Sequence, residues 1–134
     1  FSRKIVGWYL GKSQKATDVE IAFHFAIKNR KPLKGLIIHS DKGSQFRSKL
    51  YRKLLAENGF LYSYTELNHS CDQNANQESF HASLKKEWLS TRPLYYYEDA
   101  YKTIFDYIEG FYNPTRIHSS LGYLSPIQFE SVNK

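Results

Sequence analysis

Apolar residues recur along the 134-residue chain with two different spacings. Short apolar runs bounded by polar residues, glycine or proline predict strands at residues 3–10, 36–39 and 60–65. Apolar positions three and four apart, with capping and stop signals near their ends, predict helices at residues 17–31, 50–58, 74–89 and 97–112. Thr17-Asp18 is expected to cap the first helix, Lys31-Pro32 to end it, and Asn58-Gly59 to end the second. Because strands and helices alternate, the pattern favours an α/β domain built in three layers.

The stretches outside these segments are predicted to be irregular. Residues 66–73 are mostly polar and are expected to form a loop. The last helix is expected to carry an apolar stripe of Ala100, Ile104, Ile108 and Phe111. Pro114 is expected to end this helix and to leave a tail rich in turn residues. The chain is therefore interpreted as a single domain, with a core over residues 1–91 and a C-terminal helix and tail over residues 92–134.

The helix predicted over residues 74–89 has an apolar and a polar face. Its apolar face carries Phe80, Leu84 and Trp88. Glu78 and Lys85 lie on the opposite face, so the carboxylate of Glu78 is not a core group.

A polar segment follows the apolar run at residues 36–38, and it reads His39-Ser40-Asp41-Lys42-Gly43-Ser44-Gln45-Phe46. It places Asp41 at the carboxyl end of a strand, where α/β sheets usually build their sites. Asp41 and Glu78 are carboxylates from separate elements of a basic protein, and they indicate a Mg²⁺ site acting on phosphodiesters, with Mn²⁺ as a substitute. Turn chemistry explains Asp41 as well, and a carboxylate in a first helical turn explains Glu78.

Composition narrows the partners and the compartment. The net charge of +6 and the pI of about 9.3 favour polyanions. Cys71 is the only cysteine, which excludes an internal disulfide and fits a reducing cytosol; with His69 alone it makes no zinc site. No apolar run approaches the ~18 residues of a membrane span. The chain contains no methionine and is therefore expected to be a piece of a longer protein.

Five segments carry a resemblance to a known family. They are Phe1–Trp8, the Asp41 segment, Asn74–Phe80, Leu84–Glu87, and a tail with Tyr112-Asn113, Arg116–Tyr123 and Ser125-Pro126. In this order they resemble the catalytic core of the DDE transposases of bacterial insertion elements, which are related to retroviral integrases. The resemblance implies a ribonuclease-H-like (integrase catalytic core) three-layer fold. It also implies that the first two strands and the first catalytic Asp precede residue 1, so that the domain is amino-terminally truncated.

The resemblance further implies roles for individual side chains. Asp41 and Glu78 would be two of the three catalytic ligands of Mg²⁺. The substrate would be double-stranded DNA at the element ends and at the target. The groups expected to support the site are Ser44, Gln45, Asn74 and Ser79. The groups expected to contact DNA are Lys42, Arg47, Lys85, Arg116 and His118. A solvated helix position explains Lys85 equally well, and packing explains Arg116 and His118 equally well.

The implied activity is DNA strand cleavage and strand transfer during transposition of an insertion element. Because the first Asp is expected to lie outside the 134 residues, this piece alone is expected to be inactive. A non-catalytic basic remnant, which binds DNA or pairs with an intact transposase, fits the charge and the tail as well. A ribonuclease-H-like nuclease shares the carboxylates but not the tail that ends in Leu121–Pro126. The parent is expected to be a homo-multimer in the bacterial cytoplasm, without a membrane partner.

Overall fold

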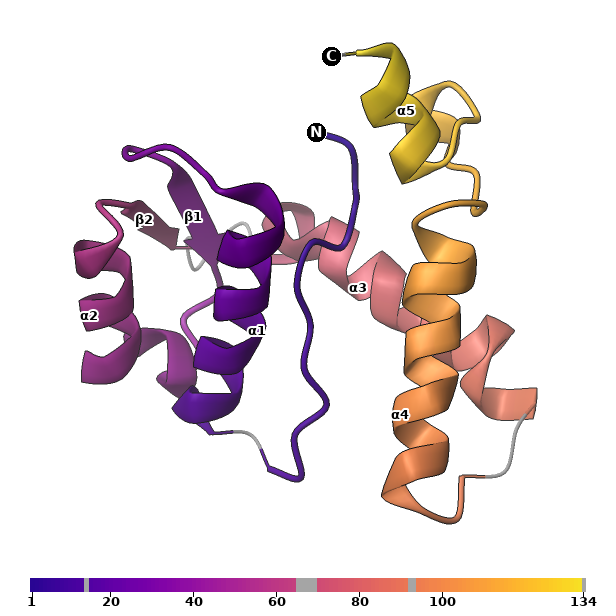
Figure 1. Ribbon diagram of the computed structural model, residues 1–134, viewed down its shortest axis with the longest axis horizontal. Coiled ribbons are helices and arrows are strands. Elements are labelled where there is room, and N and C mark those ends of the chain that lie inside the picture. Colours follow the sequence, from indigo (N-terminus) through magenta and orange to yellow (C-terminus); the bar gives the residue numbers. More distant parts are fainter. Residues whose placement is uncertain (14, 65–69, 92–93, 134) are drawn as a thin grey trace. The chain divides into compact units, whose positions relative to one another are not determined.

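The computed structural model describes residues 1–13, 15–64, 70–91 and 94–133 (Figure 1). Its elements in chain order are α1 (Ala16–Arg30), β1 (Ile37–Ser40), η1 (Ser44–Arg47), α2 (Lys49–Glu57), β2 (Leu61–Tyr64), α3 (Ser70–Glu87), η2 (Leu89–Thr91), α4 (Tyr97–Phe105), η3 (Asp106–Tyr112), η4 (Ser119–Leu121) and α5 (Pro126–Val132). The chain divides into two compact units, which we call the sheet unit (residues 6–75) and the helical unit (residues 1–5 and 76–134).

The sheet unit is built on a parallel pair of strands joined by a helix. β1 pairs with β2 in a register that runs from Ile37↔Leu61 to Ser40↔Tyr64. Parallel strands need a long crossover connection, and α2 supplies it here. This parallel strand–helix–strand unit confirms the predicted α/β class in its coarse form. In the described residues the sheet contains these two strands alone.

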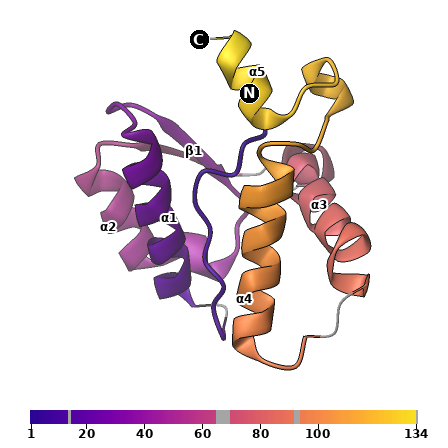
Figure 2. The ribbon, with the colours of Figure 1, turned by 45° about the vertical axis from the view of Figure 1, so that its right-hand side comes forward.

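Two helices form the core of the sheet unit together with the sheet. α1 and α2 lie side by side, as both ribbon views show (Figures 1 and 2). The buried centre consists of Tyr51, Leu55 and Phe60. The partly buried residues packed around it are Val19, Phe23, Ile27, Ile38 and Phe46. The rings of Phe23 and Phe60 meet edge to face at 6.0 Å between centroids, a favourable geometry for aromatic pairs.

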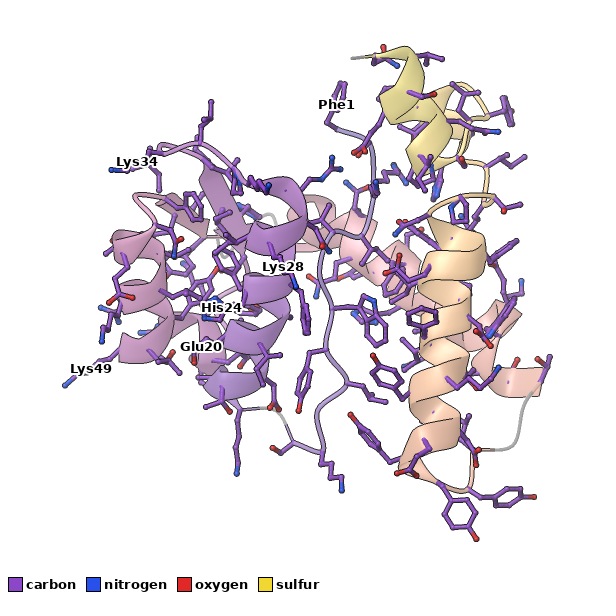
Figure 3. All side chains as sticks on the ribbon, viewed as in Figure 1. Phe1, Glu20, His24, Lys28, Lys34 and Lys49 are labelled. Carbon is purple, nitrogen blue, oxygen red and sulfur yellow. The ribbon has the colours of Figure 1, made fainter. Side chains whose placement is uncertain are left out.

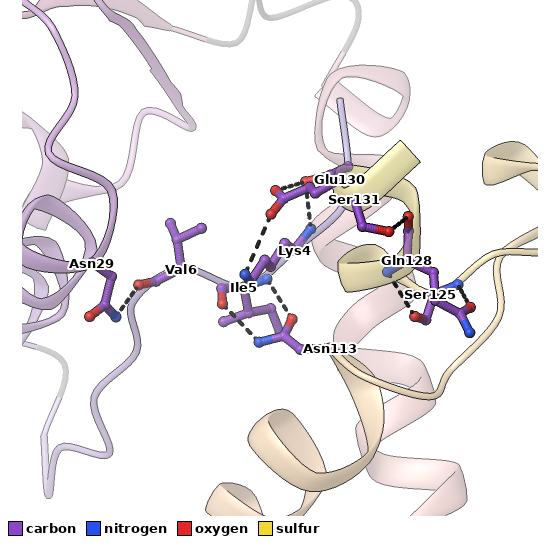
Figure 4. Close-up of polar contacts among 10 residues, drawn as sticks. Lys4, Ile5, Val6, Asn29, Asn113, Ser125, Gln128, Glu130 and Ser131 are labelled. Atoms are coloured by element: carbon purple, nitrogen blue, oxygen red, sulfur yellow. Dashed lines mark hydrogen bonds and ion pairs between the residues drawn. The ribbon is translucent and has the colours of Figure 1, made fainter. Parts of the chain in front are cut away.

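The strand predicted over residues 3–10 does not form in the structure, and that prediction is wrong. Within the helical unit, the side-chain amide of Asn113 donates to Ile5 O and accepts from Ile5 N, both at 3.0 Å (Figure 4). Within the sheet unit, Asn29 Nδ2 donates to Val6 O at 2.9 Å. Backbone groups that a neighbouring strand would have paired are therefore satisfied by side-chain amides.

Gly7 allows the chain to approach α1 closely. A Cβ atom at this position would lie 2.4 Å from Ala22 O and 2.5 Å from Ala26 N. Distances this short exclude any side chain, so glycine is required where this segment runs along α1.

The elements from α1 to β2 confirm the predicted helices and strands to within two residues. The start of α1 differs in detail, because the expected cap at Thr17-Asp18 is already inside the helix. Asp18 instead accepts a hydrogen bond from Lys15 N at 3.4 Å, so it satisfies a backbone donor from the third helical position. The helix ends, as predicted, where Lys31 takes a left-handed conformation and donates to Ile27 O at 2.7 Å.

The loop predicted over residues 66–73 is wrong in its second half. Residues 65–69 lie outside the described part, but α3 already begins at Ser70. No glycine or proline stands between residues 70 and 87, so nothing in the sequence prevents the helix from starting earlier. The predicted faces are confirmed, because Leu84 is buried while Glu78 and Lys85 are exposed.

The helix predicted over residues 97–112 forms as α4 followed by η3, a π-helix. In η3 the backbone makes bonds five residues apart, such as Asn113 N to Ile108 O at 3.0 Å. The wider turn brings Tyr107, which is fully buried, and Tyr112 into the core beside Ile108. The stripe predicted with a regular period, namely Ala100, Ile104, Ile108 and Phe111, therefore describes the core only in part.

The tail after Pro114 contains more structure than the turns predicted for it. α5 begins with a capping box, in which Ser125 Oγ accepts from Gln128 N at 3.3 Å and Gln128 Oε1 accepts from Ser125 N at 2.9 Å (Figure 4). Pro126 occupies its first turn, where a missing N–H costs nothing. The predicted single domain, with its boundary between residues 91 and 92, stays a prediction.

The core of the sheet unit leads to a prediction about stability. Leu55 is 1% exposed, so we expect Leu55→Ala to lower the free energy of unfolding by about 3 kcal/mol, because it removes apolar burial and leaves a cavity. Leu33, which is 85% exposed, is the matched control, and Leu33→Ala should change the value by less than ~0.5 kcal/mol. Urea denaturation followed by circular dichroism measures both. Equal losses for the two leucines would contradict this core.

Candidate active site

Asp41 directly follows β1, and its half-buried carboxylate is held by the loop that comes after it. Asp41 Oδ1 accepts a hydrogen bond from Gly43 N at 2.7 Å. A Cβ atom on residue 43 would lie 2.8 Å from that oxygen and 2.9 Å from Gln45 Nε2. The Gly43 N–H therefore restrains the orientation of the carboxylate, and a larger residue at position 43 would require the side chains of Asp41 and Gln45 to shift.

The residues predicted to support Asp41 belong to the same loop and to η1. Ser44 Oγ donates to Gln45 Oε1 at 3.4 Å. The contact between position 43 and the Gln45 amide places that amide close to the turn that holds Asp41. The structure therefore brings Gln45 next to the turn, while Ser44 is exposed. A supporting role for either stays a prediction.

A basic pocket of about 420 Å³ lies on the sheet unit. It is lined by Lys42, Arg47, Arg52, Tyr62 and Tyr64. Lys42 and Arg47 were predicted from the sequence to contact DNA, whereas Arg52, Tyr62 and Tyr64 were not. The period of two along a strand does place Tyr62 and Tyr64 on one face, and this signal could have found them. Their position beside the loop after Asp41 depends on the pairing of β2 with β1, which sequence spacing does not give.

Glu78 and Lys85 lie together on the exposed face of α3 in the helical unit. They are seven positions apart, or about two turns, and therefore share a face. Ser79 is exposed next to Glu78. The backbone of Asn74 is helical, but its side chain lies outside the described part. Asp41 belongs to the sheet unit.

Metal ligands are not gathered into a cluster in the described part of the chain. No three His, Cys, Asp or Glu side chains there lie close enough to hold a metal ion. Asp41 and Glu78 each offer a carboxylate that is not engaged in an ion pair within the described ranges. Carboxylate oxygens are the ligand type that hard divalent cations prefer, so the donor chemistry of both residues fits such an ion.

Arg116 is engaged within the helical unit. Its Nη2 and Nε donate to the two carboxylate oxygens of Glu87 at 2.9 and 3.1 Å, and Nη2 also donates to Ser83 Oγ at 3.0 Å. The guanidinium carbon lies 5.9 Å from the ring centre of Tyr112. The hydrogen bond from Arg116 lowers the pKa of the Glu87 carboxyl below its ordinary value. These contacts support the packing alternative for Arg116.

His118 is also part of the internal packing of the helical unit. The residue is 7% exposed, and its ring meets Tyr112 edge to face at 5.2 Å. Its backbone pairs with the end of the tail, with His118 N donating to Leu124 O at 3.1 Å. Burial lowers the pKa of the imidazole, and the charges of Arg116 and Arg3 lower it further. DNA contact by Arg116 or His118 stays a prediction.

Comparisons with known proteins agree over almost the whole chain. Two family models, each described as an integrase core domain, match residues 1–70 and 58–126. The transposase for insertion sequence element IS904 of Lactococcus lactis is 39% identical over 133 residues, which are 99% of this chain and 52% of that protein. The transposase InsF for insertion sequence IS3A of Escherichia coli is 35% identical over 133 residues, 99% of this chain and 46% of that protein.

A third relative is a 31 kDa protein of insertion element IS600 from Shigella sonnei. It is 36% identical over 129 residues, which are 96% of this chain and 47% of that protein. The chain thus spans about half the length of the curated relatives that it matches. Within the described residues, none of the helices combines the length and the apolar character needed to cross a membrane.

The environment of His118 leads to a prediction about pH. Its folded-state pKa lies below the ordinary value of 6.5, so the unfolded chain binds more protons between these two values. The free energy of unfolding should therefore fall as the pH drops below 6.5, and level off below the folded-state pKa. His118→Gln should weaken this dependence, whereas His24→Gln, which alters an exposed imidazole, should keep it. Thermal unfolding between pH 8 and 5 measures the difference; identical profiles for His118→Gln and the unaltered chain would contradict it.

Proposed function

Because the chain belongs to the integrase core domain family and is similar over nearly its whole length to insertion-element transposases, we propose that it serves DNA strand cleavage and strand transfer during transposition. The observation that carries the proposal is Asp41, which directly follows a strand of the parallel pair and is oriented by Gly43 N–H. The chain covers about half of its relatives, so the activity is proposed for the whole protein that contains it.

The fold that we propose for this domain is the ribonuclease-H-like, three-layer arrangement. Two features of the sheet unit support it. β1, α2 and β2 form a strand–helix–strand unit with parallel strands, which is the repeating unit of layered α/β folds. The helices α1 and α2 cover the face of the sheet that carries Ile38.

Asp41 and Glu78 are the proposed ligands of a divalent metal ion, Mg²⁺ with Mn²⁺ as a substitute. When bound, such an ion would activate the attacking hydroxyl and stabilise the departing oxygen of a phosphodiester. Gly43 N–H holds one oxygen of Asp41 and so limits rotation of the carboxylate. Glu78 stands on the exposed face of α3, where solvent and a substrate can reach it.

Basic side chains near Asp41 would hold the DNA backbone. Lys42 follows Asp41 directly, and Arg47 ends η1 a few residues later. Both are exposed, and neither is paired with a carboxylate in the described ranges. Lys85, on the same face of α3 as Glu78, would do the same beside the second carboxylate. Double-stranded DNA at the element ends and the target is the proposed partner, and a homo-multimer is the proposed working form.

A second candidate function is DNA binding without cleavage, either alone or as a partner of an intact transposase. The net charge of +6 and the unpaired cations at Lys42 and Arg47 in the described residues support it. These features attract DNA whether or not a metal ion binds. The bacterial relatives support a bacterial cytoplasmic location for either function.

The metal proposal is tested by magnetic resonance. Mn²⁺ added to the isotope-labelled chain should broaden the amide signals of residues 41–44 and 78–79 more than those elsewhere, because broadening falls steeply with distance from the ion. Asp41→Asn should abolish the broadening at residues 41–44, since it removes a charged ligand. Asp18→Asn removes a carboxylate of the same unit on α1 and should change nothing there. Equal effects of the two substitutions would overturn the metal site.

Strand cleavage is tested with the whole protein that contains residues 1–134, expressed from its open reading frame. We expect nicking of a labelled duplex that requires Mg²⁺ and that falls at least about a hundredfold with Asp41→Asn or Glu78→Gln, since even groups that only orient metal ligands cost 10- to 100-fold. Asp18→Asn and Glu98→Gln are matched controls that should keep the rate.

The same experiment separates the two candidate functions. One outcome is salt-sensitive DNA binding without nicking, in which Asp41→Asn and Glu78→Gln leave the affinity unchanged or improve it. This outcome would overturn the proposed strand cleavage and support DNA binding without cleavage. Removing a negative charge near DNA lowers repulsion for either function, so nicking by the unaltered protein, and not the change in binding, separates the two.

A further inference from the structure

The basic pocket of the sheet unit gathers positive charge from three segments around one hollow. Lys42 comes from the loop after β1, Arg47 from the end of η1, and Arg52 from α2. Among the described residues that line the pocket, none is acidic. Within the described ranges, Lys42 and Arg47 have no ion-pair partner. Like charges at such short range repel, and an anion bound between them removes that repulsion.

Arg52 is fixed in position while part of its guanidinium is left open. Its Nε and Nη2 donate to the backbone oxygen of Arg47 at 3.2 and 2.9 Å. A guanidinium carries five N–H donors, so these two bonds leave others available for a ligand. The same two bonds tie the backbone at the end of η1 to the side chain of Arg52 on α2. This pre-organised guanidinium suits the oxygens of a phosphate group.

The two tyrosines form the other wall of the pocket. Tyr64 donates its hydroxyl to Phe46 O at 3.1 Å, which holds its ring against the segment after Asp41. The ring of Tyr62 lies 5.3 Å from that of Tyr64 at an angle of 54°. Tyr62 remains 59% exposed, so much of its ring is available to a ligand. An exposed ring supported by a second, anchored ring offers a platform for stacking.

We propose that the basic pocket binds one nucleotide unit of single-stranded DNA, with its base stacked on Tyr62 and its phosphate bound by Arg47, Arg52 and Lys42. The volume of about 420 Å³ lies within the ~300–1,000 Å³ of small-ligand sites, which suits one nucleotide and not a duplex. A base within a duplex is already stacked on its neighbours, so only an unpaired base can use Tyr62.

The position of the pocket gives this binding a consequence for the reaction. Lys42 adjoins Asp41 in the chain, so the lining of the pocket includes the residue that follows the carboxylate proposed to act on DNA. Stacking of an unpaired nucleotide would keep the end of a strand open beside Asp41. This inference rests on the proposed function for its choice of DNA as the ligand.

The test measures binding of a short fluorescein-labelled oligothymidine to the 134-residue chain by fluorescence anisotropy, in EDTA. Arg47→Gln removes a phosphate contact, and Tyr62→Leu removes the stacking ring while keeping an apolar side chain. Lys49→Gln and Tyr9→Leu are matched controls in the same unit, and neither lines the pocket. Lys49 projects outward from the start of α2 (Figure 3). Circular dichroism of each variant confirms that it is folded.

We expect Arg47→Gln to weaken binding about tenfold and to reduce the salt slope by about 0.7, the value for one phosphate contact on a single strand. Tyr62→Leu should weaken binding about fivefold or more, and should affect a duplex of the same sequence much less. The two controls should stay within about twofold, because Lys49→Gln changes the net charge equally without touching the pocket. If Tyr62→Leu fails to fold, the comparison of Arg47→Gln with Lys49→Gln still tests whether the pocket binds the oligonucleotide.

Two outcomes would overturn the inference. Equal weakening by Arg47→Gln and Lys49→Gln would show that binding follows overall charge and not the pocket. Displacement of the oligonucleotide by inorganic phosphate as readily as by thymidine monophosphate would show a simple anion site. Because this assay contains EDTA, its failure leaves the metal-dependent proposal standing, and failure of the nicking and Mn²⁺ experiments leaves this one standing.

Discussion

The parallel pairing of β1 with β2 determines what the sheet unit can offer for chemistry. Its register sets Ser40 opposite Tyr64, so the loop that begins at Asp41 leaves the sheet beside the last residues of β2. The crossover through α2 holds this register, since Tyr51 and Leu55 on that helix are buried in the core. A slip of one residue would turn the tyrosines of β2 to the other face and separate them from Arg47 and Arg52. The carboxylate and the basic pocket therefore depend on the same strand pair.

The contacts of the basic residues separate two groups that look alike in the sequence. Arg116 makes a two-pronged ion pair with Glu87 and lies over Tyr112, which ties the tail to α3 within the helical unit. Lys42 and Arg47 lack such a partner in the described residues and line a hollow. The Glu87 carboxylate already neutralises the charge of Arg116, which weakens the attraction of this guanidinium for a phosphate. The unpaired cations are for this reason the better candidates for DNA contact.

Local signals were sufficient for some elements and not for others. α1, α2, β1 and β2 follow from apolar spacing and from stops such as Lys31 and Asn58-Gly59. The strand expected over residues 3–10 failed because a strand exists only with a partner, and Asn29 and Asn113 bind that backbone instead. The π-helix η3 was missed because a regular helical period cannot show an extra residue in a turn. Asp41 could be predicted as a site residue because it follows a strand in the sequence. Arg52 and Tyr62 could not, because their place in the pocket depends on how β1 and β2 pair.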